Sequence, residues 1–124
     1  GAIADYFIKI SSAKVSLGVG EILVRAILCN ILVCLAVWCG TKMKTESGKL
    51  IMIFWCIYIF MACGFEHSIA NMSVMAVGLL NGAGVEGVSI AGYFHNLLWV
   101  TLGNIAGGAL LVAFPYYIIQ KEKK

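Results

Sequence analysis

Residues 60–72 read Phe60-Met-Ala-Cys-Gly-Phe-Glu-His-Ser-Ile-Ala-Asn-Met72 and place four polar side chains inside a long apolar run. These side chains are Glu66, His67, Ser68 and Asn71. Ionisable groups at membrane depth are costly, and they usually line a path or a cavity. Backbone groups freed by a helix break must face protein or water rather than lipid. The stretch therefore predicts a membrane helix that is broken near residues 66–68 at a solute path, with His67 at the break.

The composition is that of a membrane protein. Of the 124 residues, 61% are hydrophobic and 12% are charged, whereas soluble domains carry roughly 25% charged residues. The net charge of +3 is too small to indicate a nucleic-acid partner. The five cysteines form no Cys-x-x-Cys pair, so we expect buried thiols rather than disulfides or a zinc site. No metal or cofactor is expected, and the lack of a nucleophile–base pair argues against an enzyme.

The apolar runs predict an all-α integral membrane protein with three transmembrane spans, the middle one broken. The expected spans are residues 21–39, 50–80 and 93–119. A spanning helix needs roughly 20 apolar residues, and the second run is longer than that, which fits two helical pieces. Gly103, Gly107 and Gly108 in the third span have the spacing of a close helix-packing face. Residues 1–20 are more polar, and we expect them to form a connection outside the membrane.

The short loops predict the orientation. Loop 40–49 and the tail after the third span are basic, through Lys42, Lys44, Lys49, Lys121, Lys123 and Lys124. Loop 81–95 has no Lys or Arg, so the positive-inside rule makes loop 40–49 and the C-terminal tail cytoplasmic. We therefore expect a multi-pass protein of the cell inner (plasma) membrane whose start lies outside. Because no signal peptide or initiator methionine precedes Gly1, further spans are expected before it.

Five residues around the polar stretch are candidates for a pathway. His67 is interpreted as a protonatable group on the path, although a structural histidine bonded between helices would give the same pattern. Glu66 remains open between a structural anchor and a pathway group, because adjacent helical residues do not face each other. Asn71 is four residues after His67 and shares its face in a helix. Lys14 is either solvated or an attractor for anions from outside. Phe60, two helical turns before His67, is either a constriction or a packed aromatic side chain.

Three segments resemble the formate/nitrite transporter family. Phe65-Glu-His-Ser-Ile-Ala-Asn-Met72 is similar to its fifth-helix motif, Cys29-Asn-Ile-Leu-Val-Cys-Leu-Ala-Val-Trp38 to its fourth and Gly103-Asn-Ile-Ala-Gly-Gly-Ala109 to its sixth. The resemblance implies that residues 1–124 are the C-terminal half of a single channel domain. That half would be one inverted-repeat half of an aquaporin-like six-span channel, a type of architecture with broken helices at a central site. The implied partners are the N-terminal half of the same protein and, in a homopentamer, further copies of it.

The resemblance also implies residue roles and a solute. By position His67 matches the family's central pore histidine, Lys14 a lysine near the outer vestibule and Asn30 the asparagine that partners this lysine. Val33 and Phe60 match hydrophobic constrictions. The implied function is passage of a small monovalent anion or its weak acid, such as formate, nitrite or hydrosulfide. A bare anion would lose its hydration between hydrophobic rings, so we expect Lys14 to attract it and His67 to supply a proton or a hydrogen bond.

Two alternatives remain open from the sequence. A haem-binding membrane anchor of a respiratory complex would use His67 and His95 as axial ligands, and it would show a Soret absorption band. A neutral-solute channel is compatible with the same fold, and its flux would not depend on protonation of the solute.

Overall fold

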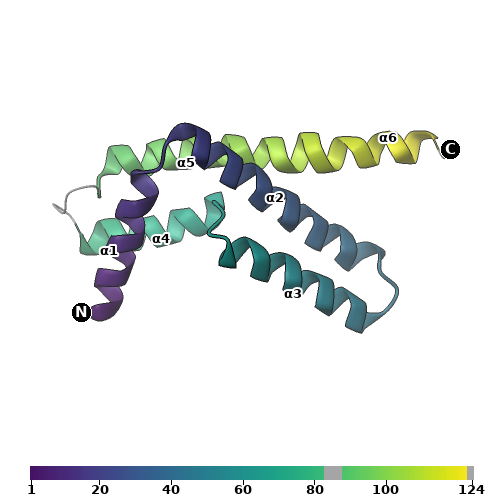
Figure 1. Cartoon of the computed structure of the whole chain (residues 1–124), viewed down its shortest axis with the longest axis horizontal. Coiled ribbons are helices and arrows are strands. Elements are labelled where there is room, and N and C mark those ends of the chain that lie inside the picture. The colour runs from purple at the N-terminus through teal and green to yellow at the C-terminus, as the bar shows by residue number, and fades with distance from the viewer. Residues whose placement is uncertain (83–87, 123–124) are drawn as a thin grey trace.

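The computed structural model describes residues 1–82 and 88–122, and every regular element there is a helix (Figure 1). The elements are α1 (Ala2–Val15), α2 (Val19–Lys42), α3 (Glu46–Ala62), α4 (Ser68–Asn81), α5 (Ile90–Ile105), the π-helical η1 (Ala106–Ala113) and α6 (Phe114–Glu122). In Figure 1, α5, η1 and α6 form one long rod, α2 and α3 form a hairpin, and α1 lies across α4. The expected all-α fold class is confirmed.

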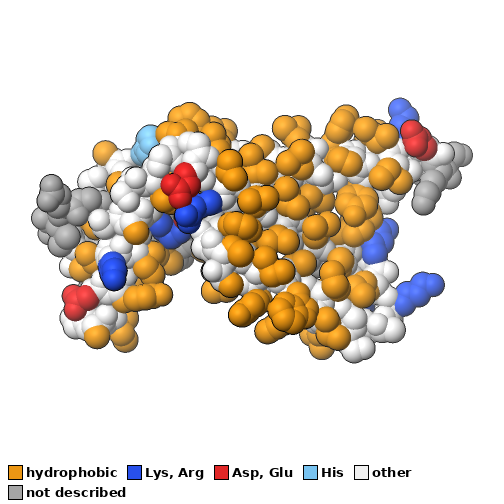
Figure 2. All heavy atoms as spheres, in the orientation of Figure 1, with side chains coloured by type: hydrophobic (Ala, Val, Ile, Leu, Met, Phe, Trp, Pro, Cys, Tyr) orange, Lys and Arg blue, Asp and Glu red, His pale blue; other side chains and the backbone are white. Residues whose placement is uncertain are grey.

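Within the described residues, two continuous helices are long and apolar enough to cross a membrane. They are Val19–Lys42, which is α2, and Ile90–Glu122, which comprises α5, η1 and α6. Ser68–Asn81 is a shorter apolar helix that continues from α3 after a short non-helical segment. Hydrophobic side chains dominate the surface over these helices (Figure 2), as expected for elements that meet lipid or other apolar helices.

A glycine turn ends α3. Gly64 adopts a left-handed conformation with φ +63°, which only glycine adopts without a steric penalty. Its N–H donates to the Met61 carbonyl at 3.1 Å, and the Phe65 N–H donates to the Phe60 carbonyl at 3.0 Å. This pair of bonds is the Schellman pattern that satisfies the last carbonyls of a helix. The chain therefore leaves α3 at Gly64, before the polar side chains are reached.

A side-chain cap starts α4. His67 has an extended backbone, and its Nδ1 accepts a hydrogen bond from the Ala70 N–H at 3.4 Å. The non-helical residues are 63–67, so the break begins earlier than the expected 66–68, and Ser68 is already helical. The expectation attributed the break to the polar side chains, but the glycine turn sets where α3 ends and the histidine cap sets where α4 begins.

Residues 1–20 differ from the expected connection, because residues 2–15 form the helix α1. Asp5 and Lys9 lie one helical turn apart on its exposed face. Ser11, on the opposite face, is buried and donates to a backbone carbonyl of α4 at 3.4 Å. Gly78 of α4 leaves the space that Ser11 fills. Asp5 and Lys9 thus face away from the rest of the molecule, whereas Ser11 faces α4.

The expected glycine face of the third span packs against α2. A Cβ atom on Gly103 would lie 2.6 Å from the Ala26 Cβ, and one on Gly107 would overlap the Ile27 carbonyl. A Cβ on Gly108 would lie 2.5 Å from the Asn30 Nδ2. Such distances are shorter than real contacts of Cβ atoms, so these glycines allow the two helices to approach each other closely.

Gly107→Ala is expected to lower stability by about 1–3 kcal/mol, because the added methyl group meets the backbone of Ile27 rather than a side chain that can move. Gly20→Ala in α2 is the matched control, since a Cβ there meets nothing within 4 Å. Thermal unfolding of the purified protein in detergent measures both variants. Equal effects of the two substitutions would contradict the packing argument.

Candidate functional site

A cavity of about 240 Å³ lies beside the helix break, between α1 and the facing ends of α3 and α4. Its polar lining is formed by Lys14, His67 and Asn71, and Phe60 belongs to its apolar lining. A water molecule occupies about 30 Å³, so the cavity has room for a solute of a few atoms. The structure therefore brings four of the sequence-predicted residues together.

His67 stacks on Phe60 at the wall of this cavity. The ring centroids are 5.9 Å apart, and the planes are inclined by 27°. Because Nδ1 accepts the cap bond from the Ala70 N–H, a neutral ring carries its proton on Nε2. The Nδ1 atom thus caps α4, while the Nε2–H is a hydrogen-bond donor. Protonating Nδ1 would break the cap of α4.

Lys14 and Glu66 form an ion pair between α1 and the break. The Lys14 Nζ lies 2.6 Å from the Glu66 Oε1, and the side chains are 18% and 2% exposed. The other carboxylate oxygen of Glu66 accepts a hydrogen bond from the Asn71 amide. Lys14 is therefore not a solvated lysine, because a buried carboxylate balances its charge. Glu66 bonds to Lys14 and Asn71, and it is absent from the cavity lining.

Asn96 completes this network, and sequence reasoning missed it. It is fully buried in α5, and its Oδ1 accepts from the Asn71 Nδ2 at 2.9 Å. Its own Nδ2 donates to the Lys14 carbonyl at 3.1 Å. A signal was present in the sequence, because an amide in an apolar segment needs a partner. Asn71, which was expected to share the face of His67, instead bonds to Glu66 and Asn96 while it lines the cavity.

Asn104 of α5 satisfies backbone groups of the break and was also missed. Its Nδ2 donates to the Ala26 carbonyl at 2.8 Å and to the Glu66 carbonyl at 3.0 Å. Its Oδ1 accepts from the Ser68 N–H at 3.0 Å. The Asn30 amide donates to the Asn104 carbonyl at 2.5 Å. Asn30, which the resemblance paired with the vestibule lysine, thus bonds to the third span, and Lys14 bonds to Glu66.

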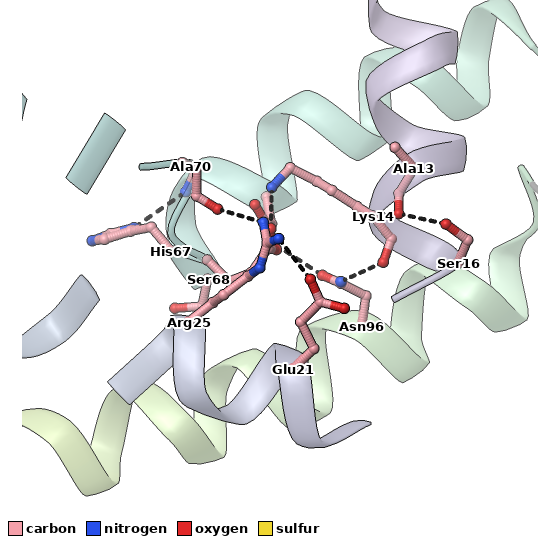
Figure 3. A network of polar contacts seen from close by, with 12 residues as sticks. Ala13, Lys14, Ser16, Glu21, Arg25, His67, Ser68, Ala70 and Asn96 are labelled. Carbon is pink, nitrogen blue, oxygen red and sulfur yellow. Dashed lines mark hydrogen bonds and ion pairs between the residues drawn. The ribbon is translucent and has the colours of Figure 1, made fainter. Parts of the chain in front are cut away.

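Arg25 of α2 reaches the same break. Its Nη1 donates to the Gly64 carbonyl at 3.2 Å, and its Nη2 donates to Glu21 at 2.6 Å. Figure 3 shows the side chains of Lys14 and Arg25 extending from α1 and α2 toward the segment that carries His67 and Ser68. Sequence reasoning missed this contact, because an arginine near a helix end is expected to extend to the membrane surface.

The lining of this cavity also lacks three other predicted positions, which are Asn30, Val33 and His95. Val33 lines a different cavity of about 370 Å³ between α2 and the η1–α6 segment, where Trp38 stacks on Tyr116 with 4.3 Å between ring centroids. His95 packs edge-on against Trp99 in α5 at 6.3 Å and is not part of the lining that includes His67.

A membrane span that is broken beside a cavity, with a histidine at the break and a partly buried ion pair next to it, is a feature of membrane channels and transporters. The all-α membrane channel fold is confirmed by comparison with solved structures. The chain belongs to the formate/nitrite transporter family, because the family model described as "Formate/nitrite transporter" matches residues 1–118. This is a family of transporters and channels rather than enzymes.

Two curated relatives illustrate the similarity in sequence. The chain is 42% identical over 110 residues to the "Nitrite transporter NirC" of Escherichia coli (strain K12), which covers 88% of this chain and 40% of that protein. It is 43% identical over 118 residues to the "Probable formate transporter" of Methanothermobacter thermautotrophicus, with 94% and 42% covered. The chain thus spans less than half the length of these relatives.

Two solved structures share the fold. One, described as "FNT family ion channel", has a TM-score of 0.84 and 35% sequence identity, and the match covers 92% of this chain and 45% of that chain. The other, described as "Pentameric formate channel with formate bound", has a TM-score of 0.81 and 28% identity, and the match covers 94% and 52%.

Proposed function

We propose that the protein is a channel or transporter for small monovalent anions or their weak acids, such as formate, nitrite or hydrosulfide. The observation that carries this proposal is the cavity at the helix break, where His67 stacks on Phe60 beside the buried Lys14–Glu66 pair. The names of the relatives support formate and nitrite as solutes. The central role of His67 and the identity of the solute are both part of the proposal.

The mechanism follows from the charges around the cavity. Phe60 and the other apolar lining residues disfavour a bare anion, because it would lose its hydration there. The charge of Lys14 is offset by Glu66, so this lysine attracts an anion without holding it as tightly as an unpaired cation would. His67 then donates a hydrogen bond from Nε2 or, when both ring nitrogens are protonated, a proton that the ring later regains from water, and the solute passes Phe60 close to neutrality.

We also propose that residues 1–124 form the C-terminal half of one channel domain, with its spans at about 21–39, 50–80 and 93–119. The N-terminal half and further copies in a homopentamer would complete the assembly. Support comes from the 40–42% of the relatives' length that the chain covers and from the pentameric structural neighbour.

For the orientation, we propose that loop 40–49 and the C-terminal tail lie on the cytoplasmic side of the inner (plasma) membrane. Basic side chains gather at the end of the molecule where the α2–α3 connection and the end of α6 lie (Figure 2), and the positive-inside rule supports this placement. Lys123 and Lys124 of the tail lie outside the described residues.

Solute flux into liposomes that contain the full-length protein tests the function. The solutes are formate, nitrite, hydrosulfide and the neutral control glycerol, each at two pH values. Anion flux that rises as the pH falls, with glycerol excluded, supports the proposal, and the order of rates identifies the solute. Equal passage of glycerol would favour a neutral-solute channel. A Soret band in the absorption spectrum of the purified protein would favour the haem-binding alternative.

His67→Asn is expected to slow formate flux by about tenfold, the effect of losing one hydrogen bond to a charged ligand, and to flatten its pH dependence. Asparagine is a good helix N-cap, so this variant keeps the start of α4 intact. His67→Phe removes the cap as well, and we expect lower stability in addition to the lost flux. His95→Gln, outside the cavity lining, is the matched control. Unchanged flux and pH dependence in both His67 variants would refute the role of His67.

A further inference from the structure

The broken segment exposes backbone carbonyls that require donors. The Schellman turn satisfies those of Phe60 and Met61, and the Asn104 side chain satisfies that of Glu66. The carbonyl of Gly64 accepts from the Arg25 guanidinium at 3.2 Å. This bond is exposed in the chain, so its role is to hold the carbonyl in place by a charged donor, and its loss would free the segment to take a different path.

The side chains that bond to the broken segment come from different helices. Lys14 in α1 binds the Glu66 side chain, Asn104 in α5 binds the backbone at Glu66 and Ser68, and Arg25 in α2 binds the backbone at Gly64. The attachment by Arg25 lies nearest to the end of α3. It therefore fixes the Gly64 turn relative to α2, because neither of the other two side chains bonds to Gly64.

Arg25 is itself oriented by a second contact. Glu21, one helical turn earlier on α2, accepts from Nη2 at 2.6 Å, while Nη1 points to the Gly64 carbonyl. A planar guanidinium offers donors in a fixed fork, so holding one of its nitrogens also aims the other. The Glu21–Arg25 pair is thus arranged to present a charged donor to the glycine turn.

We propose that Arg25 is a positioning residue that sets the separation of Phe60 and His67 by holding the Gly64 carbonyl. Gly64 lies between these two rings in the chain, and the rings stack at 5.9 Å across the turn. A displaced turn changes this separation and with it the width of the cavity beside the rings. The proposal rests on the proposed function only insofar as Phe60 and His67 line the solute path.

Hydrogen–deuterium exchange of the full-length protein in detergent or nanodiscs provides a test that does not depend on transport. Arg25→Met removes every donor but keeps an apolar side chain of similar length. It is expected to speed amide exchange about tenfold in peptides that cover residues 60–70, the effect of losing one charge-assisted hydrogen bond. Lys49→Met is the matched control, because Lys49 pairs with Glu46 at 2.9 Å near the α2–α3 connection.

Two milder variants keep the test decisive if Arg25→Met does not assemble. Arg25→Lys retains the charge but lacks the two planar N–H donors of the guanidinium. Glu21→Gln removes the carboxylate that orients Arg25 but leaves the contact to Gly64. Both are expected to show a smaller increase in exchange that is confined to residues 60–70. Exchange at the wild-type rate in all variants that assemble would overturn the proposal, as would an increase spread evenly over the protein.

Transport then distinguishes this proposal from the proposed function. In liposomes, Arg25→Met is expected to raise the ratio of lactate flux to formate flux, because a displaced Phe60–His67 pair discriminates less by size. Faster exchange at residues 60–70 in a protein that passes no anion would support the role of Arg25 in positioning and refute the anion path. Wild-type exchange in a protein that conducts formate would refute the role of Arg25 alone.

Discussion

Lys14→Met is expected to destabilise the protein by about 3–5 kcal/mol, which is the largest single effect that we expect. The Glu66 carboxylate is 2% exposed and lies 2.6 Å from the Lys14 ammonium. Without the lysine, the buried Glu66 carboxylate keeps the hydrogen bond from the Asn71 amide but has no counter-charge. Thermal unfolding in detergent measures the effect, and the loss of the assembled species is used to monitor it.

The double variant Lys14→Met with Glu66→Gln tests the reason for this loss. A neutral amide at position 66 no longer requires a counter-charge, so the double variant is expected to regain most of the stability lost by Lys14→Met. Lys49→Met removes the cation of an exposed pair and is expected to cost less than about 1 kcal/mol. If the double variant is as unstable as the sum of the two single variants, the ion pair is not the source of the effect.

Asn104→Ala is also expected to have a large effect, because one side chain bonds to three backbone groups. The Ser68 N–H loses its acceptor and the Glu66 carbonyl loses its donor. The Ala26 carbonyl loses one of two donors, because it lies inside α2 and keeps its intrahelical bond. Each buried polar group left without a partner costs about 1–3 kcal/mol, so we expect a total loss of several kcal/mol. The loss is measured by thermal unfolding, and faster hydrogen exchange near residues 66–68 is expected to accompany it.

Asn81→Ala is the matched control for this prediction, since the Asn81 side chain donates to a backbone carbonyl of its own helix at an exposed position. It is expected to change stability by less than about 0.5 kcal/mol. Asn104→Asp retains an acceptor for the Ser68 N–H but loses both donated bonds, and it introduces a buried charge. An Asn104→Ala variant that is as stable as Asn81→Ala would show that the break does not depend on Asn104.

The class of fold and the presence of a break were predictable from local sequence. A long apolar run interrupted at Glu66 and His67 predicts a broken membrane helix, because such groups cannot face lipid. The spacing of Gly103 and Gly107 predicts close packing, since a missing side chain has the same consequence in any helix that meets another. These inferences depend on residue type and short-range spacing, which are properties of the sequence.

The partners of the polar side chains could not be predicted in this way. Lys14 and Glu66 are 52 positions apart, and the amide of Asn30 bonds to a carbonyl 74 positions away. The contact from Arg25 to Gly64 likewise depends on where α2 passes the break. A buried polar group must find a partner, but which partner it finds depends on the groups that helix packing places within about 3 Å, and this is a property of the assembled helices.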